Sequence, residues 1–274
     1  MSVVCAEGPK LEIIKPGREA HTLLERAFFY GLMKITELFK EKNINYSLYG
    51  GTSYQLLFTY ALMKQQGKNC LEEVVNLSES LRPTSDLDFI FSKDVRKNIF
   101  EIISELAPEK CLEESFGREA YSLKVVRVGE KRLVIDVIGV TERKISDVNI
   151  WVNLTYYLKE DDWHKEMLEE ENQLKISLKY DKEGLLYLDN IKVSRPEYTA
   201  VGKLLRLNKE KDIFDLLTAL QLLEIDIKKI DCLLRKERKK LRGEKLERIN
   251  EILRALNGGK KGIEKYLNSL AISH

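Results

Sequence analysis

The sequence predicts an α+β fold in which a mixed sheet flanked by helices occupies residues 1–194 and an all-helical part occupies residues 195–274. Up to about Ser194, short runs rich in β-branched and aromatic residues alternate with segments of helical periodicity. From Pro196 onward only helical periodicity remains. With 43% hydrophobic residues among 274, the chain can bury the core of one large domain or of two modest ones.

The first part opens with a helix and continues as strands and helices in alternation. Apolar residues from Leu23 to Leu38 keep helical spacing, so a helix is expected from about Arg18 to a break at residues 41–43. The next expected elements, in order, are strand Tyr46–Tyr49, helix Thr52–Met63, helix Cys70–Leu81, strand Leu87–Phe91, helix Asp94–Leu106, and a hairpin of strands Tyr121–Val128 and Arg132–Val140 that turns at Gly129-Glu130.

The stretch from Ser146 to Val193 has an ambiguous pattern, and the part after it is helical. In the ambiguous stretch, Trp151–Tyr157 and Leu185–Val193 are typical of strands, and Asp161–Glu171 of a charged surface helix. The helices expected after it are Pro196–Leu207, Lys211–Leu223, Ile227–Lys240, Gly243–Leu256 and Gly262–Leu270.

Composition excludes several classes of protein. No apolar run approaches the ~18 residues that a membrane span needs, and the N-terminal sequence has no apolar signal-peptide core. The cysteines form no CxxC pair and the three histidines lie far apart, so neither a disulfide framework nor a zinc site is indicated. We therefore expect a soluble cytoplasmic protein with no membrane partner.

Charge is distributed unevenly along the chain. The whole chain has a net charge of +2, but residues 226–274 contain 14 Lys and Arg against 7 Asp and Glu, a net +7. The basic residues are densest in the run Arg235–Arg242. This charge would suit a polyanionic partner, and the alternative is an ordinary solvated helical face.

Two short motifs carry the most specific chemistry. Gly50-Gly51-Thr52-Ser53 joins a strand to a helix, and backbone N–H groups at such a helix start can face phosphate oxygens. Asp86 and Asp88 are two residues apart on one predicted strand, so their side chains would lie on the same face of the sheet. The two carboxylates would repel each other unless a cation lies between them. A hard divalent cation such as Mg²⁺ suits those oxygens. The alternative is a plain strand–turn–helix corner with a solvated acidic strand end.

A third carboxylate lies inside the apolar run Leu133–Ile138. Burial of Asp136 there is costly unless the residue is paired or binds a metal, so it is the candidate to complete a three-carboxylate site with Asp86 and Asp88. Asp147 is the fallback, and the alternative for Asp136 is an outward-facing position on an edge strand. We expect the three carboxylates to converge in a cleft between the sheet part and the helices.

These motifs resemble the polymerase-β-type minimal nucleotidyltransferase superfamily. The segment Arg82–Phe89, which reads RPTSDLDF, is particularly similar to the AbiEii/AbiGii toxin family of type IV toxin–antitoxin systems. A second match lies in Arg195-Pro196-Glu197, followed by the segments 203–207 and 211–216. The resemblance thus covers roughly residues 48–223.

The chain departs from the family pattern at two places. The 34 residues between Gly51 and Asp86 exceed the usual gap, which indicates an insertion around residues 66–82. Asn208 and Lys209 stand where the family more often has Arg.

The resemblance implies a role for each matching residue. Asp86 and Asp88 would hold the Mg²⁺ or Mn²⁺ that binds the triphosphate, and Asp136 would help to hold a second metal ion and activate the acceptor hydroxyl. Lys203 would neutralise phosphate charge, and Asp212 and Asp215, one helical turn apart, would both point at the cleft. The nucleotide-binding residues would be Gly50, Gly51, Thr52, Ser53, Arg82, Lys211 and Asp212. Without the family match, the alternative for Lys203, Lys211 and Asp212 is ordinary helix-surface charge.

The implied function is the transfer of NMP from an NTP to an acceptor. The family points to RNA, in particular a tRNA 3′ end, which the basic C-terminal helices would contact, with an antitoxin protein acting indirectly. Two alternatives stay open: a small-molecule nucleotidyltransferase of the antibiotic-modifying kind, and a non-catalytic nucleotide-binding regulator.

Overall fold

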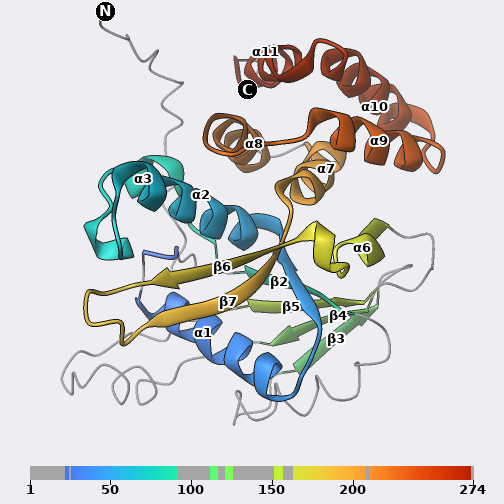
Figure 1. The fold of residues 1–274 in the computed structure, drawn as a ribbon. Coiled ribbons are helices and arrows are strands. Elements are labelled where there is room, and N and C mark those ends of the chain that lie inside the picture. Colours follow the sequence, from blue (N-terminus) through green and yellow to red (C-terminus); the bar gives the residue numbers. More distant parts are fainter. Residues whose placement is uncertain are drawn as a thin grey trace, which may run out of the picture.

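The computed structural model describes residues 22–24, 26–84, 86–91, 112–116, 121–125, 151–156, 163–207 and 210–272 (Figure 1). Within these residues one sheet of seven strands has the order β3-β4-β5-β2-β1-β7-β6. The strands are β1 Tyr46–Tyr49, β2 Asp86–Phe91, β3 Leu112–Phe116, β4 Tyr121–Val125, β5 Trp151–Tyr156, β6 Gln173–Lys179 and β7 Tyr187–Ser194. The sheet is mixed, because β2 pairs parallel with β5 and antiparallel with β1, and β1 pairs parallel with β7.

Helices surround the sheet and make up the whole C-terminal part. Those before and beside the sheet are α1 Arg26–Glu41, α2 Gly50–Gln66, α3 Leu77–Ser80 and α6 Trp163–Glu166, with short 3₁₀ turns at Leu71–Glu73 and Glu170–Asn172. The C-terminal helices are α7 Pro196–Arg206, α8 Glu210–Leu222, α9 Ile227–Arg238, α10 Gly243–Leu256 and α11 Gly259–Ile272. The predicted α+β class, with an all-helical C-terminal half, is confirmed.

Strand β2 separates two hydrophobic cores. Phe89 and Phe91 pack edge-on against Phe39 of α1, with ring centroids 5.1 and 5.3 Å apart, in the first core. Ile90 belongs to the second core, which the C-terminal helices share. Because side chains alternate along a strand, Asp88 shares the face of Ile90. The carboxylate of Asp88 is therefore on the side of the sheet that meets the helical part.

Helix α2 lies between the sheet and the helical part. It contacts β1, β2 and β6 on one side and α7 and α8 on the other. Its residues from Thr52 to Thr59 are all buried, including the polar ones. The first half of α2 is thus buried on all sides, while Tyr60, Lys64 and Gln65 in its second half are exposed. Through these contacts α2 connects the two parts of the chain.

The change from strand to helix falls where the sequence places it. β7 ends at Ser194 and α7 begins at Pro196, whose ring suits the first turn of a helix. The division into domains 1–194 and 195–274 stays a prediction, since α2 packs against both parts.

Several predicted elements differ from the structure. The helix expected over Cys70–Leu81 is wrong: a 3₁₀ turn and the four-residue α3 stand there, because Val74 is extended and Asn76 adopts a left-handed conformation with φ 60°. The helix expected over Asp161–Glu171 is reduced to α6, and β3 and β6 were not predicted. The expected helix Asp94–Leu106 and strand Arg132–Val140 lie outside the described residues. In the part that the structure describes, no helix is long and apolar enough to span a bilayer.

Candidate active site

The strand–helix corner after β1 is built around Gly50. Tyr49 is extended and gives the helix no side-chain cap, and Gly50 follows with φ +75°, a conformation that side chains rarely adopt. A Cβ added at Gly50 would also collide with the carboxylate Oδ2 of Asp88, which is opposite Tyr49 in the β1–β2 register. Two independent reasons, the backbone conformation and the close contact, therefore favour glycine at position 50. The absence of a side chain lets the main chain of the corner lie directly against the Asp88 carboxylate.

The other side of the same corner faces a guanidinium group. A Cβ at Gly51 would lie 2.7 Å from Nη2 of Arg82 and 3.7 Å from Oγ1 of Thr84. The backbone of Arg82 is held in place, because Nε2 of Gln55 donates to its carbonyl oxygen at 2.9 Å. The two sequence motifs therefore meet in space. We call Gly50, Gly51, Arg82 and Asp88 the glycine corner.

Hydroxyl groups near the corner bond to one another inside the protein. The N–H of Gly50 donates to Oγ1 of Thr199 at 3.2 Å, and Oγ of Ser53 donates to the carbonyl of Gly50 at 2.8 Å and lies 3.0 Å from the same Thr199 oxygen. Thr52 and Ser53 are fully buried. The expected phosphate contacts of these two residues stay a prediction, and sequence reasoning missed Thr199, which connects the corner to α7.

Four charged side chains form a buried chain behind the corner, which we call the corner ion cluster: Arg82, Lys203, Asp212 and Asp215. Nε and Nη2 of Arg82 donate to both oxygens of Asp215 at 2.6–2.9 Å. Nζ of Lys203 lies 2.6 Å from Asp215 and 3.1 Å from Asp212. The Lys203 side chain is only 1% exposed, so the alternative of ordinary helix-surface charge is wrong for Lys203 and, by the same burial, for Asp212.

Within the cluster two cations balance two carboxylates, and the exposed Arg206 lies 3.8 Å from Oδ1 of Asp212. Burial of ions is costly, and only close pairing with good hydrogen bonds offsets that cost. The pairing has one gap within the described residues: Oδ2 of Asp212 is buried and has no hydrogen-bond partner. Asp212 and Asp215, which we expected to point at the cleft, point at Lys203.

Tyr54 closes the cluster from α2. Its hydroxyl donates to the carbonyl oxygen of Pro196 at 3.1 Å, and its ring centroid lies 5.8 Å from Nζ of Lys203. Burial, together with the nearby Asp215 and Glu197 carboxylates, raises the pKa of Tyr54 well above its ordinary value. Tyr54 thus packs against the ion cluster as a neutral side chain and does not serve as an acid.

Of the three carboxylates expected to bind a divalent cation, the structure describes the side chain of Asp88. Asp88 supplies carboxylate oxygen, and the missing Cβ of Gly50 leaves room for that carboxylate beside the main chain. The backbone of Asp86 opens β2, while its side chain and the whole of Asp136 and Asp147 lie outside the described residues. Among the side chains that are described, no three His, Cys, Asp or Glu form a metal site. The convergence of three carboxylates stays a prediction.

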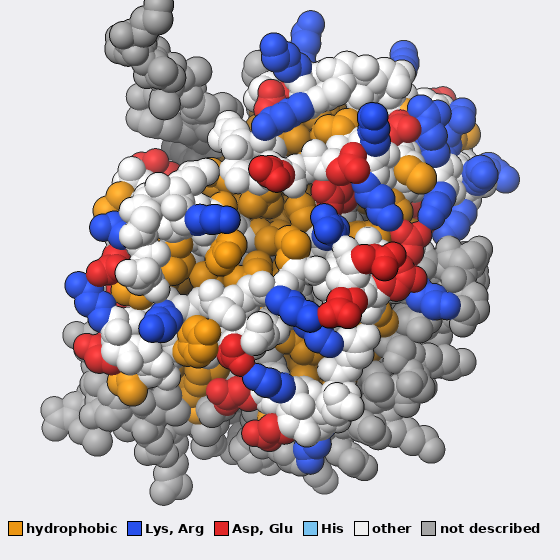
Figure 2. Space-filling model, in the orientation of Figure 1, with side chains coloured by type: hydrophobic (Ala, Val, Ile, Leu, Met, Phe, Trp, Pro, Cys, Tyr) orange, Lys and Arg blue, Asp and Glu red, His pale blue; other side chains and the backbone are white. Residues whose placement is uncertain are grey.

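Basic residues of the C-terminal helices gather on a separate surface. Figure 2 shows Lys and Arg side chains over α9 and α10, with acidic side chains between them. Glu166 bonds to both Lys229 and Lys236, at 3.0 and 2.8 Å. Further pairs or bonds join Arg235 to Asp231, Arg238 to Asn250 and Lys240 to Glu237. The residues around a cavity of about 440 Å³ between α9 and α10 are Arg235, Arg238, Lys239 and Leu246.

The remaining predicted nucleotide-binding residue is Lys211. It lies in the first turn of α8 and is exposed, one residue before the buried Asp212. Asn208 and Lys209, where the family pattern has Arg, lie outside the described residues.

Comparison with solved structures gives five similar chains, including the two that follow. One is described as the antibiotic-resistance factor ANT(2'')-Ia: it has 11% sequence identity and a TM-score of 0.43, and the match covers 78% of this chain and 92% of that one. The other is an antigenic nucleotidyltransferase-like protein from Paracoccidioides brasiliensis, with 15% identity, a TM-score of 0.42, and coverage of 84% and 94%. No protein-family model and no curated protein sequence matches the chain. At these values the likeness identifies neither a family nor an activity.

Proposed function

We propose that this protein is a metal-dependent nucleotidyltransferase that moves NMP from an NTP to an RNA acceptor. One observation carries the proposal: the main chain of Gly50 and Gly51 lies between the Asp88 carboxylate and the Arg82 guanidinium. A carboxylate suits a divalent cation and a guanidinium suits phosphate oxygens, and NTP binding requires both at one place.

Each residue of the corner has a proposed task. Gly50, Gly51 and Arg82 bind the triphosphate, and Asp88 holds Mg²⁺ or Mn²⁺ together with Asp86 and Asp136. When bound, the cation would neutralise phosphate charge and favour deprotonation of the acceptor hydroxyl. In the transfer, the acceptor oxygen bonds the α-phosphorus while the bond to the β-phosphate oxygen breaks, and pyrophosphate leaves. The chain therefore has to position and neutralise rather than supply a covalent nucleophile.

For Lys203 the proposed task is positioning. Its ammonium group is buried between Asp212 and Asp215, and Asp215 in turn holds Arg82 in a bidentate pair. Lys203 thus fixes α8 and, through Asp215, the orientation of the guanidinium at the corner. Sequence reasoning placed Lys203 beside the phosphates, and the contacts of its ammonium group favour this indirect role.

The RNA acceptor and the toxin role rest on the sequence resemblance and on the basic surface of α9 and α10. The C-terminal segment of residues 226–274, which contains this surface, carries a net charge of +7. Phosphate backbones bind such surfaces through salt-dependent contacts. We extend the proposal to the toxin of a type IV pair that modifies a tRNA 3′ end, with an antitoxin acting indirectly.

The test is incubation with each labelled NTP, Mg²⁺ and total RNA, followed by a gel. We expect one NTP to label RNA, and a chelator to abolish the labelling. Asp88→Asn should lower transfer by about 100-fold or more, since it removes a group that acts on the transition state. Asp189→Asn, on the exposed part of β7, is the matched control and should transfer normally.

Three outcomes would redirect or end the proposal. In a parallel assay with small-molecule antibiotics as acceptors, label that appears on an antibiotic but not on RNA would support the small-molecule alternative. If Asp88→Asn, folded by circular dichroism, kept near wild-type transfer, the corner would not be the active site. Absence of transfer to any acceptor would favour the non-catalytic regulator.

A further inference from the structure

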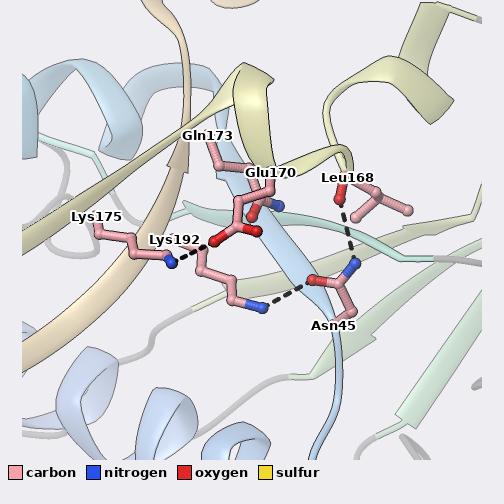
Figure 3. A pocket seen from close by; sticks show the side chains of 6 residues that line it. All are labelled: Asn45, Leu168, Glu170, Gln173, Lys175 and Lys192. Atoms are coloured by element: carbon pink, nitrogen blue, oxygen red, sulfur yellow. Dashed lines mark hydrogen bonds and ion pairs between the residues drawn. The ribbon is translucent and has the colours of Figure 1, made fainter.

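A second polar pocket lies at the far end of β1 from the glycine corner. Its lining residues are Asn45, Leu168, Glu170, Gln173, Lys175 and Lys192, and its volume is about 300 Å³ (Figure 3). Asn45 precedes β1, whereas Gly50 follows it, so the two sites are at opposite ends of this strand. We call this site the edge pocket, because β6 is the edge strand of the described sheet.

Two lysines face each other across the strands of the edge pocket. Lys175 of β6 and Lys192 of β7 are direct partners in the antiparallel register. Like charges directly opposite each other destabilise a sheet, so this pair needs a compensating negative charge. Burial lowers the pKa of Lys192, and the neighbouring Lys175 lowers it further, although Glu170 partly opposes the effect.

The compensation that the protein provides is incomplete. The carboxylate of Glu170 lies 2.6 Å from the ammonium of Lys175. Lys192 donates instead to a neutral group, the Asn45 amide oxygen, at 2.8 Å, and forms no ion pair among the residues that the structure describes. Figure 3 shows both bonds, with the Glu170 carboxylate joined to Lys175 and the Lys192 ammonium group turned to Asn45. The pocket thus has one negative charge too few.

Hydrogen bonds to the main chain hold Gln173 and Asn45 in the pocket, whereas the carboxylate of Glu170 is exposed to solvent. Nε2 of Gln173 donates to the carbonyls of Tyr46 and Met167, and Nδ2 of Asn45 donates to the carbonyl of Leu168. Glu170, by contrast, lies on a 3₁₀ turn with a side chain 81% exposed. An exposed ion pair is weak, so Glu170 is readily displaced by a competing anion.

We propose that the edge pocket binds a phosphate-like oxyanion, which takes the place of the Glu170 carboxylate between Lys175 and Lys192. Two ammonium groups balance the charge of a phosphate dianion, and they would donate to its oxygens as charge-assisted hydrogen bonds. The volume stands at the lower limit of ligand pockets, about 300–1,000 Å³, which favours a small ion over a nucleotide. The inference does not depend on the proposed transfer activity.

The test is a titration of the full chain with inorganic phosphate, followed by the backbone amide signals in ¹⁵N NMR spectra. We expect saturable shifts at Glu170, Lys175 and Lys192, which are distinct from any shifts at residues 50–53. A second titration with glycerol phosphate separates the sources, because a site for a phosphate ester binds it at least as well as the free ion.

Four variants test the edge pocket, with weaker, tighter or unchanged phosphate binding expected. Lys192→Gln should weaken phosphate binding by about tenfold or more, because one of two charged donors is lost. Lys175→Gln should have the same effect and replaces the first variant if Lys192→Gln folds poorly. Glu170→Gln should tighten binding, since it removes the competing carboxylate. Lys179→Gln, the same charge change on β6 outside the pocket, should leave binding unchanged.

The inference is overturned by any of three results. These are an absence of saturable shifts at the pocket, wild-type affinity in both folded lysine variants, and weaker binding by Glu170→Gln. If the wild-type chain showed no NTP transfer activity, the phosphate titration could still be carried out and read. The two proposals can therefore fail separately.

Discussion

The corner ion cluster and the charged surface of α9 contain the same types of residue in opposite surroundings. In the cluster, Lys203 and Asp212 are both 1% exposed and the pairs are 2.6–3.1 Å long. On α9, Lys236 and Arg235 are about half exposed, at 52% and 53%, although their ion pairs are as short, at 2.8 and 2.7 Å. The lengths of the ion pairs alone therefore do not distinguish the corner ion cluster from the surface of α9.

What differs is the consequence of losing a partner. A buried charge left alone keeps its full desolvation cost, whereas an exposed one is solvated by water and screened by salt. The cluster therefore fixes the geometry of the corner, and the α9 surface remains free to exchange its partners for phosphates of a ligand.

The largest effect is expected from Lys203→Ala. The change removes the buried ammonium group that lies between Asp212 and Asp215. Asp215 keeps Arg82, but the buried Asp212 keeps only the exposed Arg206 at 3.8 Å, so the free energy of unfolding should fall by about 3–5 kcal/mol. Urea denaturation measures it, and Lys236→Ala on α9 is the control, with a loss below about 1 kcal/mol. Equal losses in the two variants would show that burial does not separate these regions.

A smaller effect is expected from Gly51→Ala at the corner. The added methyl group requires the Arg82 guanidinium to shift, because Nη2 lies 2.7 Å from the Cβ position, and overpacking of this kind costs about 1–3 kcal/mol. NTP binding should weaken with it. Gly202→Ala on α7 meets nothing within 4 Å and should be neutral or slightly stabilising. If both variants behaved alike, Arg82 would not be held against the corner.

The combined change of Arg235, Arg238 and Lys239 to Gln should leave the unfolding midpoint unchanged while it weakens RNA binding. Loss of three phosphate contacts should lower the slope of log affinity against log salt by about 2 for a single strand. Filter binding over a salt series measures the slope. An unchanged slope would mean that the basic surface is only a solvated face.

The smallest effect concerns the pH dependence of stability at Glu166. Burial would raise its pKa, but hydrogen bonds from Lys236 and Lys229 outweigh burial and lower the pKa below 4.5. A lowered pKa in the folded state means that the contribution to stability is present above pH 4.5 and is lost as the pH falls below it. Glu166→Gln should therefore lower Tm near neutral pH and converge with the wild type in acid. A gap in Tm that does not narrow in acid would contradict this assignment.

Much of the fold could be predicted from local patterns. The strands Tyr46–Tyr49 and Leu87–Phe91 and all five C-terminal helices match the structure to within about three residues, since periodicity and Gly or Pro breaks determine them locally. The segment Cys70–Leu81 was expected to be a helix because its charge pattern fits one. That prediction is wrong because the left-handed backbone of Asn76 interrupts the helix. β6 was not predicted, although Leu174, Ile176 and Leu178 alternate with polar residues in the pattern of a strand.

The candidate site could be predicted in residue type but not in arrangement. A Gly-Gly turn is itself a signal for left-handed backbone, and Gly50 adopts it. The pair Arg82–Asp215, by contrast, joins residues 133 positions apart, and the partner of a buried charge is decided by packing of α8 on α2. For the same reason Thr199 gave no signal in the sequence.

The position of α7 and α8 in the chain has a consequence for biosynthesis. Residues up to Ser194 leave the ribosome first, with β1, α2 and the Gly50 turn already synthesised. At that stage Arg82 has no Asp215, Gly50 has no Thr199, and the outer side of α2 is exposed to water or to chaperones. The corner is completed only when the last third of the polypeptide emerges, so a nascent chain stalled before α8 would carry both motifs and still lack an assembled site.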